Sequence, residues 1–368
     1  MQNKKILIIP RAHIGDFIWV TSAVALIKKQ EPSVAITVII PKNLIEFVKN
    51  NPIFNNCYVY DNALFESSNI YIKIFYRFFL FFKSIFILRK NTFDVCFLFS
   101  PFELFIKLSL FLKIKKLVYS IYECCGYNVV SREKQILTKF AKQSILSPVE
   151  THKEADFIHY SERFQILVRA YFGTSNISLP VIPNLKSSYV KSPSKTPKKI
   201  AVCMQGIKTA KNKWPAQYFA ETIKKISETF DVEFFIVGGK EQADYADEFI
   251  LTLHGIKIIN MCGKTSLLEL KDFFTKIDLL ISVDTGLSHI AALTKLKMIT
   301  FFGMTAPNAS IPMSPNNISF YTGIECSPCM YALAFEKKKC PYGDNPKCME
   351  MIKPQEVIQA AIKILEQK

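Results

Sequence analysis

The chain has 368 residues, of which 49% are hydrophobic, and this length suggests two domains that each bury a core. Its densest apolar run, Phe78 to Phe82, is closed by charged residues and is far too short to span a bilayer. The basic start precedes an apolar stretch too short for a signal peptide, which indicates a cytoplasmic protein. A net charge of +16 favours a polyanionic partner, namely nucleic acid, an anionic membrane or a phosphorylated substrate.

The first part of the chain alternates between strand and helix patterns. Short apolar runs of strand length alternate with segments of helical spacing, in the order Lys4 to Pro10, Asp16 to Lys29, Val34 to Ile40, Asn43 to Asn50 and Cys57 to Tyr60. The order βαβαβ predicts a parallel sheet with helices on both faces.

Residues 70–116 form long Phe-rich stretches of helical spacing, interrupted by a strand at Asp94 to Phe99. Aromatic and aliphatic residues occupy one face of the first stretch: Ile72, Phe75, Phe79, Phe82 and Phe86. Its other face carries Lys73, Arg77 and Ser84. A basic, aromatic amphipathic helix can lie in a membrane interface. We favour a helix packed on the sheet, because both faces of the sheet need covering.

The Pro-, Ser- and Lys-rich segment 180–199 is typical of a linker between domains. We therefore expect an N-terminal domain at 1–179, a second domain at 200–353 and a C-terminal helix at 354–368. Expected strands of the second domain are Ile200 to Cys203, Glu233 to Val237, Lys257 to Ile259, Leu279 to Val283 and Met298 to Phe302. Expected helices are Ala216 to Phe230, Gln242 to Leu253, Ser266 to Thr275 and Leu287 to Leu293. Two successive doubly wound α/β domains result.

The segment Asp284-Thr285-Gly286-Leu287-Ser288-His289 lies between a buried strand and a helix. Ligands of open parallel sheets bind beyond the carboxyl ends of the strands, where helix N-termini offer unpaired N–H groups to anions. Gly286 lets the backbone approach a phosphate, while Thr285 and Ser288 supply hydroxyls and His289 a further donor. A capped helix with a core histidine explains the same residues, since Asp and Thr are good N-caps.

Two other loops reach the same edge of the second sheet. The lysine-rich loop after its first strand brings cations and a hydroxyl that suit a diphosphate: Lys208, Thr209, Lys211 and Lys213. A solvated loop is an equal alternative. The turn Gly238-Gly239 follows the second strand, and there Glu241 can accept hydrogen bonds from ribose hydroxyls.

The first domain offers a loop with one glycine, Arg11 to Asp16, which enters a helix. It lacks the G-x-G-x-x-G fingerprint, and this weakens an interpretation as a nicotinamide-binding enzyme. Asp16 is either a helix cap or a general base that faces a cleft between the domains.

Four of the ten cysteines cluster late in the chain, at Cys326, Cys329, Cys340 and Cys348. One C-x2-C pair could belong to a structural zinc site, although the second pair is too widely spaced for a standard ribbon. Reduced structural thiols explain them equally well, and nothing suggests catalysis there.

These pieces, in this order, resemble glycosyltransferase family 9, the ADP-heptose glycosyltransferases known as lipopolysaccharide heptosyltransferases. The resemblance covers nearly the whole chain. It rests on Ile14-Gly15-Asp16, Lys213-Trp214-Pro215, Gly238-Gly239, Gly263 to Leu267, Ser282 to His289, and Phe302 to Pro307. The segment Asp284 to His289, followed by Phe302 to Pro307, is the most specific part.

The resemblance implies a GT-B architecture, with two Rossmann-like domains facing a cleft. It also implies inverting, metal-independent transfer of heptose from ADP-heptose to the inner core of lipopolysaccharide, without a cofactor. The C-terminal domain would bind the donor and the N-terminal domain a phosphorylated lipid A core acceptor. The protein would then be peripheral to the anionic inner membrane and would not bind nucleic acid.

The resemblance also gives the motif residues their roles. Asp16 becomes the candidate base, and Glu241 would contact the ribose while the backbone near Thr265 lines the adenine pocket. The donor would be held by Asp284, Thr285, Gly286, Leu287 and His289.

Two positions depart from the family pattern. The usual lysine two residues before Trp-Pro is Asn212 here, so the phosphate contact is divided between Lys211 and Lys213. In the segment that is usually F-G-P-T-D-P, Met304 stands in place of the proline and Ala306 in place of the aspartate, so the family's aspartate is absent.

Two other functions are alternatives to a heptosyltransferase. A sugar-nucleotide epimerase of the GT-B fold would bind a donor but need no lipid acceptor. A nucleic-acid-binding protein would use the basic charge and a cysteine-bound metal, but it should interleave exposed aromatic residues with Lys and Arg on its strands. Most aromatic residues here have the spacing of core positions, so this alternative ranks last.

Overall fold

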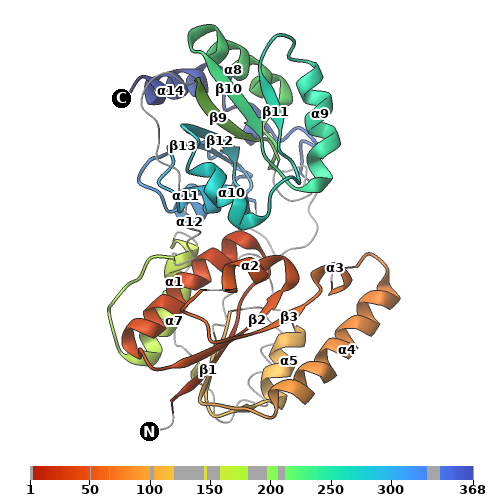
Figure 1. Cartoon of the computed structure of the whole chain (residues 1–368), viewed down its shortest axis with the longest axis vertical. Coiled ribbons are helices and arrows are strands. Elements are labelled where there is room, and N and C mark those ends of the chain that lie inside the picture. The colour runs from red at the N-terminus through yellow and green to blue at the C-terminus, as the bar shows by residue number, and fades with distance from the viewer. Residues whose placement is uncertain are drawn as a thin grey trace. The chain divides into compact units, whose positions relative to one another are not determined.

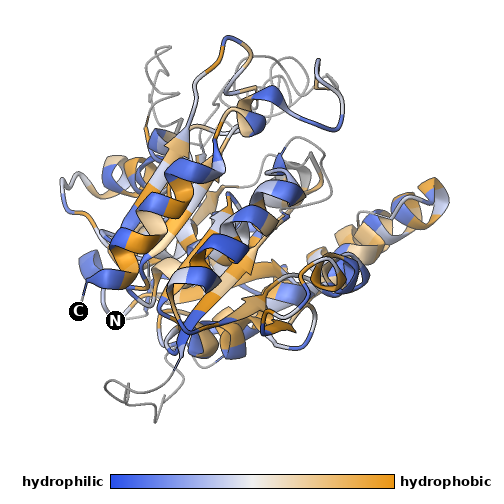
Figure 2. Cartoon of the chain, turned by 90° about the horizontal axis from the view of Figure 1, so that it is seen from above, coloured by the Kyte–Doolittle hydropathy of each residue, from blue (hydrophilic) through white to orange (hydrophobic). Residues whose placement is uncertain are grey.

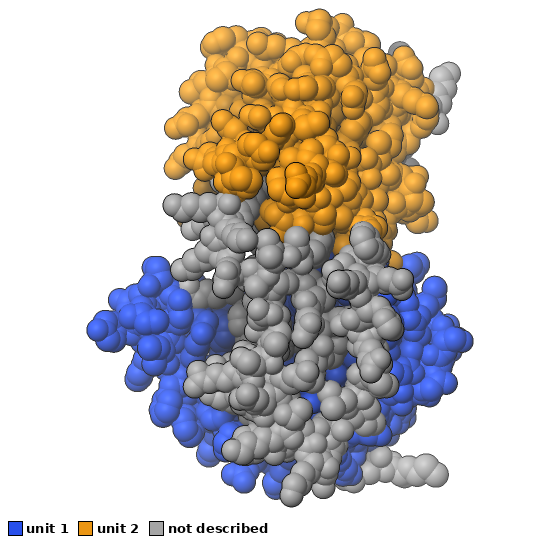
Figure 3. Space-filling view, turned by 180° about the vertical axis from the view of Figure 1, so that it is seen from behind, with its two compact units in different colours: residues 1–183 blue, residues 184–368 orange. Residues whose placement is uncertain are grey.

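The computed structural model divides the chain into two compact units, residues 1–183 and 184–368 (Figure 3). The residues that it describes are 3–49, 51–65, 67–99, 103–119, 145–146, 158–180, 197–205, 212–329 and 340–367. Most of the expected linker at 180–199 lies outside these residues. The division of the chain falls within that expected linker.

The first unit is built on a six-stranded parallel sheet with the strand order β3-β2-β1-β5-β7-β8 (Figure 1). Its strands are β1 Lys5–Ile9, β2 Ala35–Pro41, β3 Asn56–Tyr60, β5 Val95–Leu98, β7 Leu117–Tyr119 and β8 Ile145–Leu146. A separate pair joins β4 Thr92–Phe93 to β6 Lys113–Ile114. The helices are α1 Ile14–Gln30, α2 Ile45–Val48, α3 Asn62–Phe65, α4 Ile70–Leu88, α5 Glu103–Phe111 and α7 Tyr160–Phe172, with a 3-10 turn η1 at Lys42–Leu44.

The second unit repeats this plan in the order β11-β10-β9-β12-β13-β14. Its strands are β9 Lys198–Cys203, β10 Val232–Ile236, β11 Ile258–Asn260, β12 Leu279–Val283, β13 Met298–Phe302 and β14 Asn317–Tyr321. Its helices are α8 Ala216–Thr229, α9 Ala243–Leu251, α10 Leu267–Phe274, α11 Gly286–Ala292, α12 Pro307–Ser310, α13 Lys347–Glu350 and α14 Pro354–Glu366, with η4 at Lys240–Gln242. Counted along the chain, both sheets have the Rossmann order 3-2-1-4-5-6. The prediction of two Rossmann-like α/β domains is confirmed.

The two sheets also share a side-chain device at the start of the fourth strand. Asp94 accepts a hydrogen bond from the backbone N–H of Lys5 at 2.8 Å, and Asp278 accepts one from the backbone N–H of Lys199 at 2.9 Å. In each case the aspartate backbone N–H also donates to the carbonyl of the same residue, at 2.8 Å. The carboxylate therefore fixes the register between the first and fourth strands of each sheet, where the strand order reverses.

Helix α7 covers the first sheet together with α1, although no sequence pattern predicted it. Polar side chains connect the two helices: Ser22 Oγ lies 2.8 Å from Ser161 Oγ, and Gln165 donates to Ser22 at 3.2 Å. Trp19 stacks on Tyr160 with ring centroids 4.9 Å apart. The face of α7 that packs on α1 is thus partly polar.

The expectation that the Phe-rich segment packs on the sheet holds for one side of α4, which joins the hydrophobic core that includes residues of β1 and β5. Only Leu80 and Leu88 of this helix are buried. It packs against α3 and α5 along the outer edge of the first unit (Figure 1). Its aromatic face is exposed. Among the described helices, none is both long enough and apolar enough to cross a membrane.

The core of the second unit is organised around Trp214, at the entry to α8. Its side chain is 2% exposed, and its ring stacks on Phe301 with centroids 4.4 Å apart. The indole N–H donates to the carbonyl of Ile352 at 2.9 Å, which ties the start of α8 to the segment before α14. A buried indole of this kind needs such a partner.

Replacing Trp214 by Phe should therefore destabilise the second unit. The substitution leaves the buried carbonyl of Ile352 without its donor and removes ring volume, at a cost of about 1–3 kcal/mol in the free energy of unfolding. Urea unfolding followed by circular dichroism measures this cost. Leu251→Ala, at a side chain that is 70% exposed, is the control and should change the value little. Equal stability of the two variants would contradict this role of the indole.

Candidate active site

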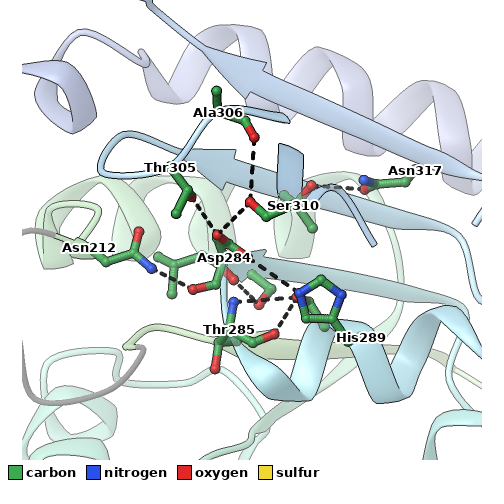
Figure 4. Close-up of polar contacts among 12 residues, drawn as sticks. Asn212, Asp284, Thr285, His289, Thr305, Ala306, Ser310 and Asn317 are labelled. Carbon is green, nitrogen blue, oxygen red and sulfur yellow. Dashed lines mark hydrogen bonds and ion pairs between the residues drawn. The ribbon is translucent and has the colours of Figure 1, made fainter. Parts of the chain in front are cut away.

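The loops after β9 and β12 flank the point at which the strand order of the second sheet reverses. The side chain of Asn212 connects the two loops, because its Nδ2 donates to the backbone carbonyl of Asp284 at 2.5 Å (Figure 4). Asn212 itself is 5% exposed. In open α/β sheets this switch point is where ligands bind. The asparagine that replaces the family's usual lysine is therefore a scaffold residue that joins the two loops.

The carboxylate of Asp284 is the centre of a polar network. Its Oδ2 accepts hydrogen bonds from Thr305 Oγ1 at 2.5 Å and from Ser310 Oγ at 3.2 Å (Figure 4). Its Oδ1 lies 3.6 Å from His289 Nε2. The side chain of Asp284 is only 9% exposed, so these partners replace the water that the carboxylate loses on burial. Asp284 is thereby fixed between α11 and α12.

Helix α11 begins at Gly286, directly after this network. Ser288 Oγ accepts from the backbone N–H of Thr285 at 3.4 Å and donates to its carbonyl at 2.6 Å, which closes the first turn. Thr285, Gly286 and Leu287 are half-buried. The backbone N–H groups of Gly286 and Leu287 belong to the first turn, where an α-helix has donors without intrahelical acceptors. This arrangement can bind an anion such as a diphosphate.

His289 occupies the position expected of a core histidine. Its side chain is 5% exposed and lies against Asp284. In this geometry it orients the carboxylate. Its predicted direct contact with a donor stays a prediction.

The turn after β10 packs on the turn after β11 at the same edge of the sheet. Gly263 has φ +69°, and a Cβ there would approach Lys240 Cα to 2.7 Å, so only glycine fits. A Cβ at Gly239 would meet the carboxylate of Glu241 at 2.4 Å, which places that exposed carboxylate against the glycine backbone. Thr265 is half-buried just before Ser266, the N-cap of α10. Glu241, in η4, and Thr265 thus lie at the edge of the sheet that also carries Asp284.

The lysine-rich loop is described only at its end. Lys208, Thr209 and Lys211 lie outside the described residues. Lys213 is exposed, and its backbone forms a bridge with Gln205. It lines a pocket of about 230 Å³ that also includes Tyr245, Asp344 and Glu350. Its predicted contact with phosphate stays a prediction.

Asp16 lies in the first turn of α1, which follows the carboxyl end of β1. Its side chain is 13% exposed, and Arg11 Nη1 is 3.8 Å from its Oδ1. The N-cap of α1 is His13 rather than Asp16, and it makes no side-chain capping hydrogen bond. The carboxylate of Asp16 is therefore not the N-cap of this helix. Its predicted role as a base stays a prediction.

The late cysteines gather near Gly303. A Cβ at Gly303 would meet Cys348 Sγ at 2.8 Å, and Ser327, next to Cys326, donates to the Gly303 carbonyl. Burial, together with the nearby thiols of Cys326, Cys329 and Cys340, raises the pKa of Cys348 to about 11. Within the described ranges no three His, Cys, Asp or Glu side chains are placed to hold a metal ion. The zinc alternative stays a prediction.

Sequence reasoning did not assign Thr305 and Ser310 to the site. Thr305 belongs to a motif segment, Phe302 to Pro307, but only the structure relates it to Asp284. Ala306, where the family has aspartate, is the N-cap of α12 and offers no side-chain acceptor. An aspartate there would be a helix cap.

A family model described as glycosyltransferase family 9 (heptosyltransferase) matches residues 134–340 of this chain. Lipooligosaccharide heptosyltransferase 2 of Campylobacter jejuni is 30% identical over 240 residues, which are 62% of this chain and 72% of the relative.

Solved structures agree with the fold. The ADP-heptose lipopolysaccharide heptosyltransferase II of E. coli superposes with a TM-score of 0.72 at 17% identity, covering 99% of both chains. A family 9 glycosyltransferase of Veillonella parvula superposes with a TM-score of 0.73 at 19% identity, covering 99% of this chain and 98% of that one. The fold is GT-B, with two Rossmann-like domains. Because the family model matches more than half of the chain, this protein belongs to glycosyltransferase family 9, the heptosyltransferases.

Proposed function

We propose that this enzyme transfers heptose from ADP-heptose to the inner core of lipopolysaccharide, with inversion at the anomeric carbon and without a metal ion. The observation that carries the proposal is the Asp284 network at the switch point of the second sheet, in a chain that belongs to the heptosyltransferase family. The names of the relatives supply the donor and the class of acceptor.

The donor diphosphate binds at the start of α11. The backbone N–H groups of Gly286 and Leu287 and the hydroxyl of Thr285 donate to its oxygens, while Asp284 and His289 keep this turn in place. Glu241 accepts from the ribose, and the backbone near Thr265 lines the adenine site. As the bond from the anomeric carbon to the diphosphate breaks, ADP leaves with the electron pair. Fixed N–H donors stabilise that charge, and the predicted phosphate contact of Lys211 or Lys213 would add to them.

The acceptor hydroxyl attacks the anomeric carbon from the face opposite ADP, and this displacement inverts the configuration. Asp16 takes the proton of that hydroxyl as the new C–O bond forms. Its position in the first turn of α1, beyond the carboxyl end of β1, supports this role, because ligands of open α/β sheets bind at that edge.

The acceptor is a phosphorylated lipid A core, and the enzyme acts in the cytoplasm, peripheral to the inner membrane. The net charge of +16 suits this anionic partner. A sugar-nucleotide epimerase would use the same donor site but would convert the nucleotide sugar without an acceptor. An assay of the donor alone separates the two functions, because only an epimerase would alter ADP-heptose in the absence of acceptor.

The Thr285 hydroxyl should contribute to nucleotide binding. Thr285→Val removes a hydrogen bond to a charged oxygen and should raise the Kd for ADP roughly tenfold or more, measured by calorimetry. Thr285→Ser keeps the hydroxyl and should restore binding. Thr294→Val, two residues after the last residue of α11, is the control and should bind as the parent does. Equal affinities for Thr285→Val and Thr294→Val would contradict a diphosphate at this turn.

Asp16→Asn should abolish most of the transfer but not nucleotide binding. Removal of a general base lowers kcat by about 10²–10⁴-fold, whereas the Kd for ADP should not change. Asp244→Asn, at an exposed carboxylate in the first turn of α9, is the matched control. The assay follows transfer from ADP-heptose to defined core acceptors. Full activity of Asp16→Asn would exclude it as the base, and no transfer by the parent to any acceptor would overturn the proposed function.

Metal independence is tested in the same assay. Because charge on the departing ADP is stabilised by protein donors, a chelator such as EDTA should leave kcat unchanged. A loss of activity that added Mg²⁺ restores would contradict this part of the proposal.

A further inference from the structure

Helix α4 has its hydrophobic face turned to solvent. Its most exposed aromatic side chains are between 52% and 82% exposed and follow one another at spacings of three or four residues: Tyr71, Phe75, Phe78, Phe82 and Phe86. That spacing places them in one stripe along the helix. We call these five residues the aromatic stripe. Scattered exposed apolar residues are ordinary, but a continuous stripe of this kind marks an interaction surface.

The stripe is long and lies at the outer edge of the first unit. The 19 residues of α4 correspond to about 28 Å of helix at the usual rise per residue. In Figure 2 the helix at the right edge reaches away from the body of its unit and carries hydrophobic residues along its length. On its other side, Leu80 and Leu88 belong to the hydrophobic core. The helix is thus anchored on one side and open on the other.

The charge around the stripe has one sign. Residues 67–93 contain five basic residues and no acidic residue: Lys73, Arg77, Lys83, Arg89 and Lys90. Lys83 Nζ lies 5.6 Å from the ring centre of Phe79, and Lys90 Nζ lies 5.2 Å from that of Phe86. Lysines that run beside exposed rings keep their ammonium groups at the border between apolar and polar surroundings.

Other basic residues near α4 are already engaged within the protein. Arg77 donates from Nε to the carbonyl of Phe65 at 3.1 Å, and Lys115 pairs with Asp94 at 2.7 Å. Lys116 lies over the ring of Tyr171 at 5.1 Å. The exposed cations beside the stripe are therefore Lys83, Arg89 and Lys90.

We propose that α4 lies in the interface of an anionic lipid bilayer, with the aromatic stripe among the headgroups and upper acyl chains and with Lys83 and Lys90 beside lipid phosphates. Aromatic residues on one side with flanking cations are the composition of interfacial helices. A second copy of the chain fits less well, since a symmetric pairing of two α4 helices would bring together two segments of the same positive charge. This inference names the membrane surface of the enzyme and rests on the proposed function only for its biological purpose.

The test is sedimentation of the full-length protein with vesicles of phosphatidylcholine, with and without phosphatidylglycerol. The parent should bind the anionic vesicles. Phe75→Ser/Phe82→Ser should lower the partition coefficient at least about tenfold, because two rings that would be buried in the bilayer are removed. Leu251→Ser/Ile318→Ser changes two exposed apolar residues of the other unit and should bind as the parent does. Lys83→Glu/Lys90→Glu should weaken binding to the vesicles that contain phosphatidylglycerol and leave binding to the neutral vesicles unchanged.

Three results would overturn the inference. The first is parental binding by Phe75→Ser/Phe82→Ser, and the second is equal binding of the parent to neutral and anionic vesicles. The third is a dimer of the parent, seen by light scattering, that this double variant no longer forms, which would assign the stripe to a second copy.

Transfer to a delipidated, water-soluble core acceptor separates this inference from the proposed function. Phe75→Ser/Phe82→Ser should keep the parental kcat with this acceptor, because its chemistry does not need a bilayer. A strong loss of kcat would place the stripe in the catalytic site instead. Absence of transfer by the parent would contradict the proposed function alone, since the vesicle result does not depend on it.

Discussion

The buried carboxylate of Asp284 is the interaction on which the geometry of the donor site depends. Its backbone N–H continues the pairing with β13 through the carbonyl of Phe301 at 3.0 Å, and its own carbonyl accepts from Asn212. Its side chain takes the hydroxyls of Thr305 and Ser310. A buried carboxylate is tolerated only when such partners surround it, so one residue fixes the loops that follow β9, β12 and β13. Because α11 begins two residues after Asp284, this residue also positions the first turn of the helix.

Much of the fold could be predicted, because hydrophobic strands of parallel sheets are continuous and unmistakable. The bounds of β12 Leu279–Val283 and β13 Met298–Phe302 agree with the prediction residue for residue. Helix α7 was missed because its packing face includes the polar residues Ser161, Arg163 and Gln165, which are all buried. Strand β14 was missed because it is half-exposed and mixes polar with apolar residues.

Helix α4 illustrates a different limit. The spacing of its apolar residues predicts a helix with two different faces, but it does not show which face packs against the rest of the unit. Sheet packing would bury the aromatic face, whereas the structure buries Leu80 and Leu88 and leaves Phe75 and Phe82 exposed. The choice depends on α5 and α3, which provide the surface that α4 covers. Tertiary context of this kind cannot be seen in the periodicity of one segment.

The location of the candidate site was predicted better than the contacts of its individual residues. The motif residues Glu241, Thr265 and Asp284 all lie in the segments that follow strands at the carboxyl edge of one sheet, as parallel topology requires. Sequence alone could not tell that His289 is buried against Asp284, or that the hydroxyls come from Thr305 and Ser310. Those contacts join segments far apart in the chain, and no local spacing encodes them.

The central claim is that the diphosphate of the donor binds on the turn that Asp284 organises. A crystal structure of the full chain with ADP tests it most directly. We predict diphosphate oxygens within hydrogen-bonding distance of the backbone N–H groups of Gly286 and Leu287, with the carboxylate of Asp284 still bound to Thr305 and Ser310. A diphosphate held in the first unit, or held in the second without contact to this turn, would contradict the account.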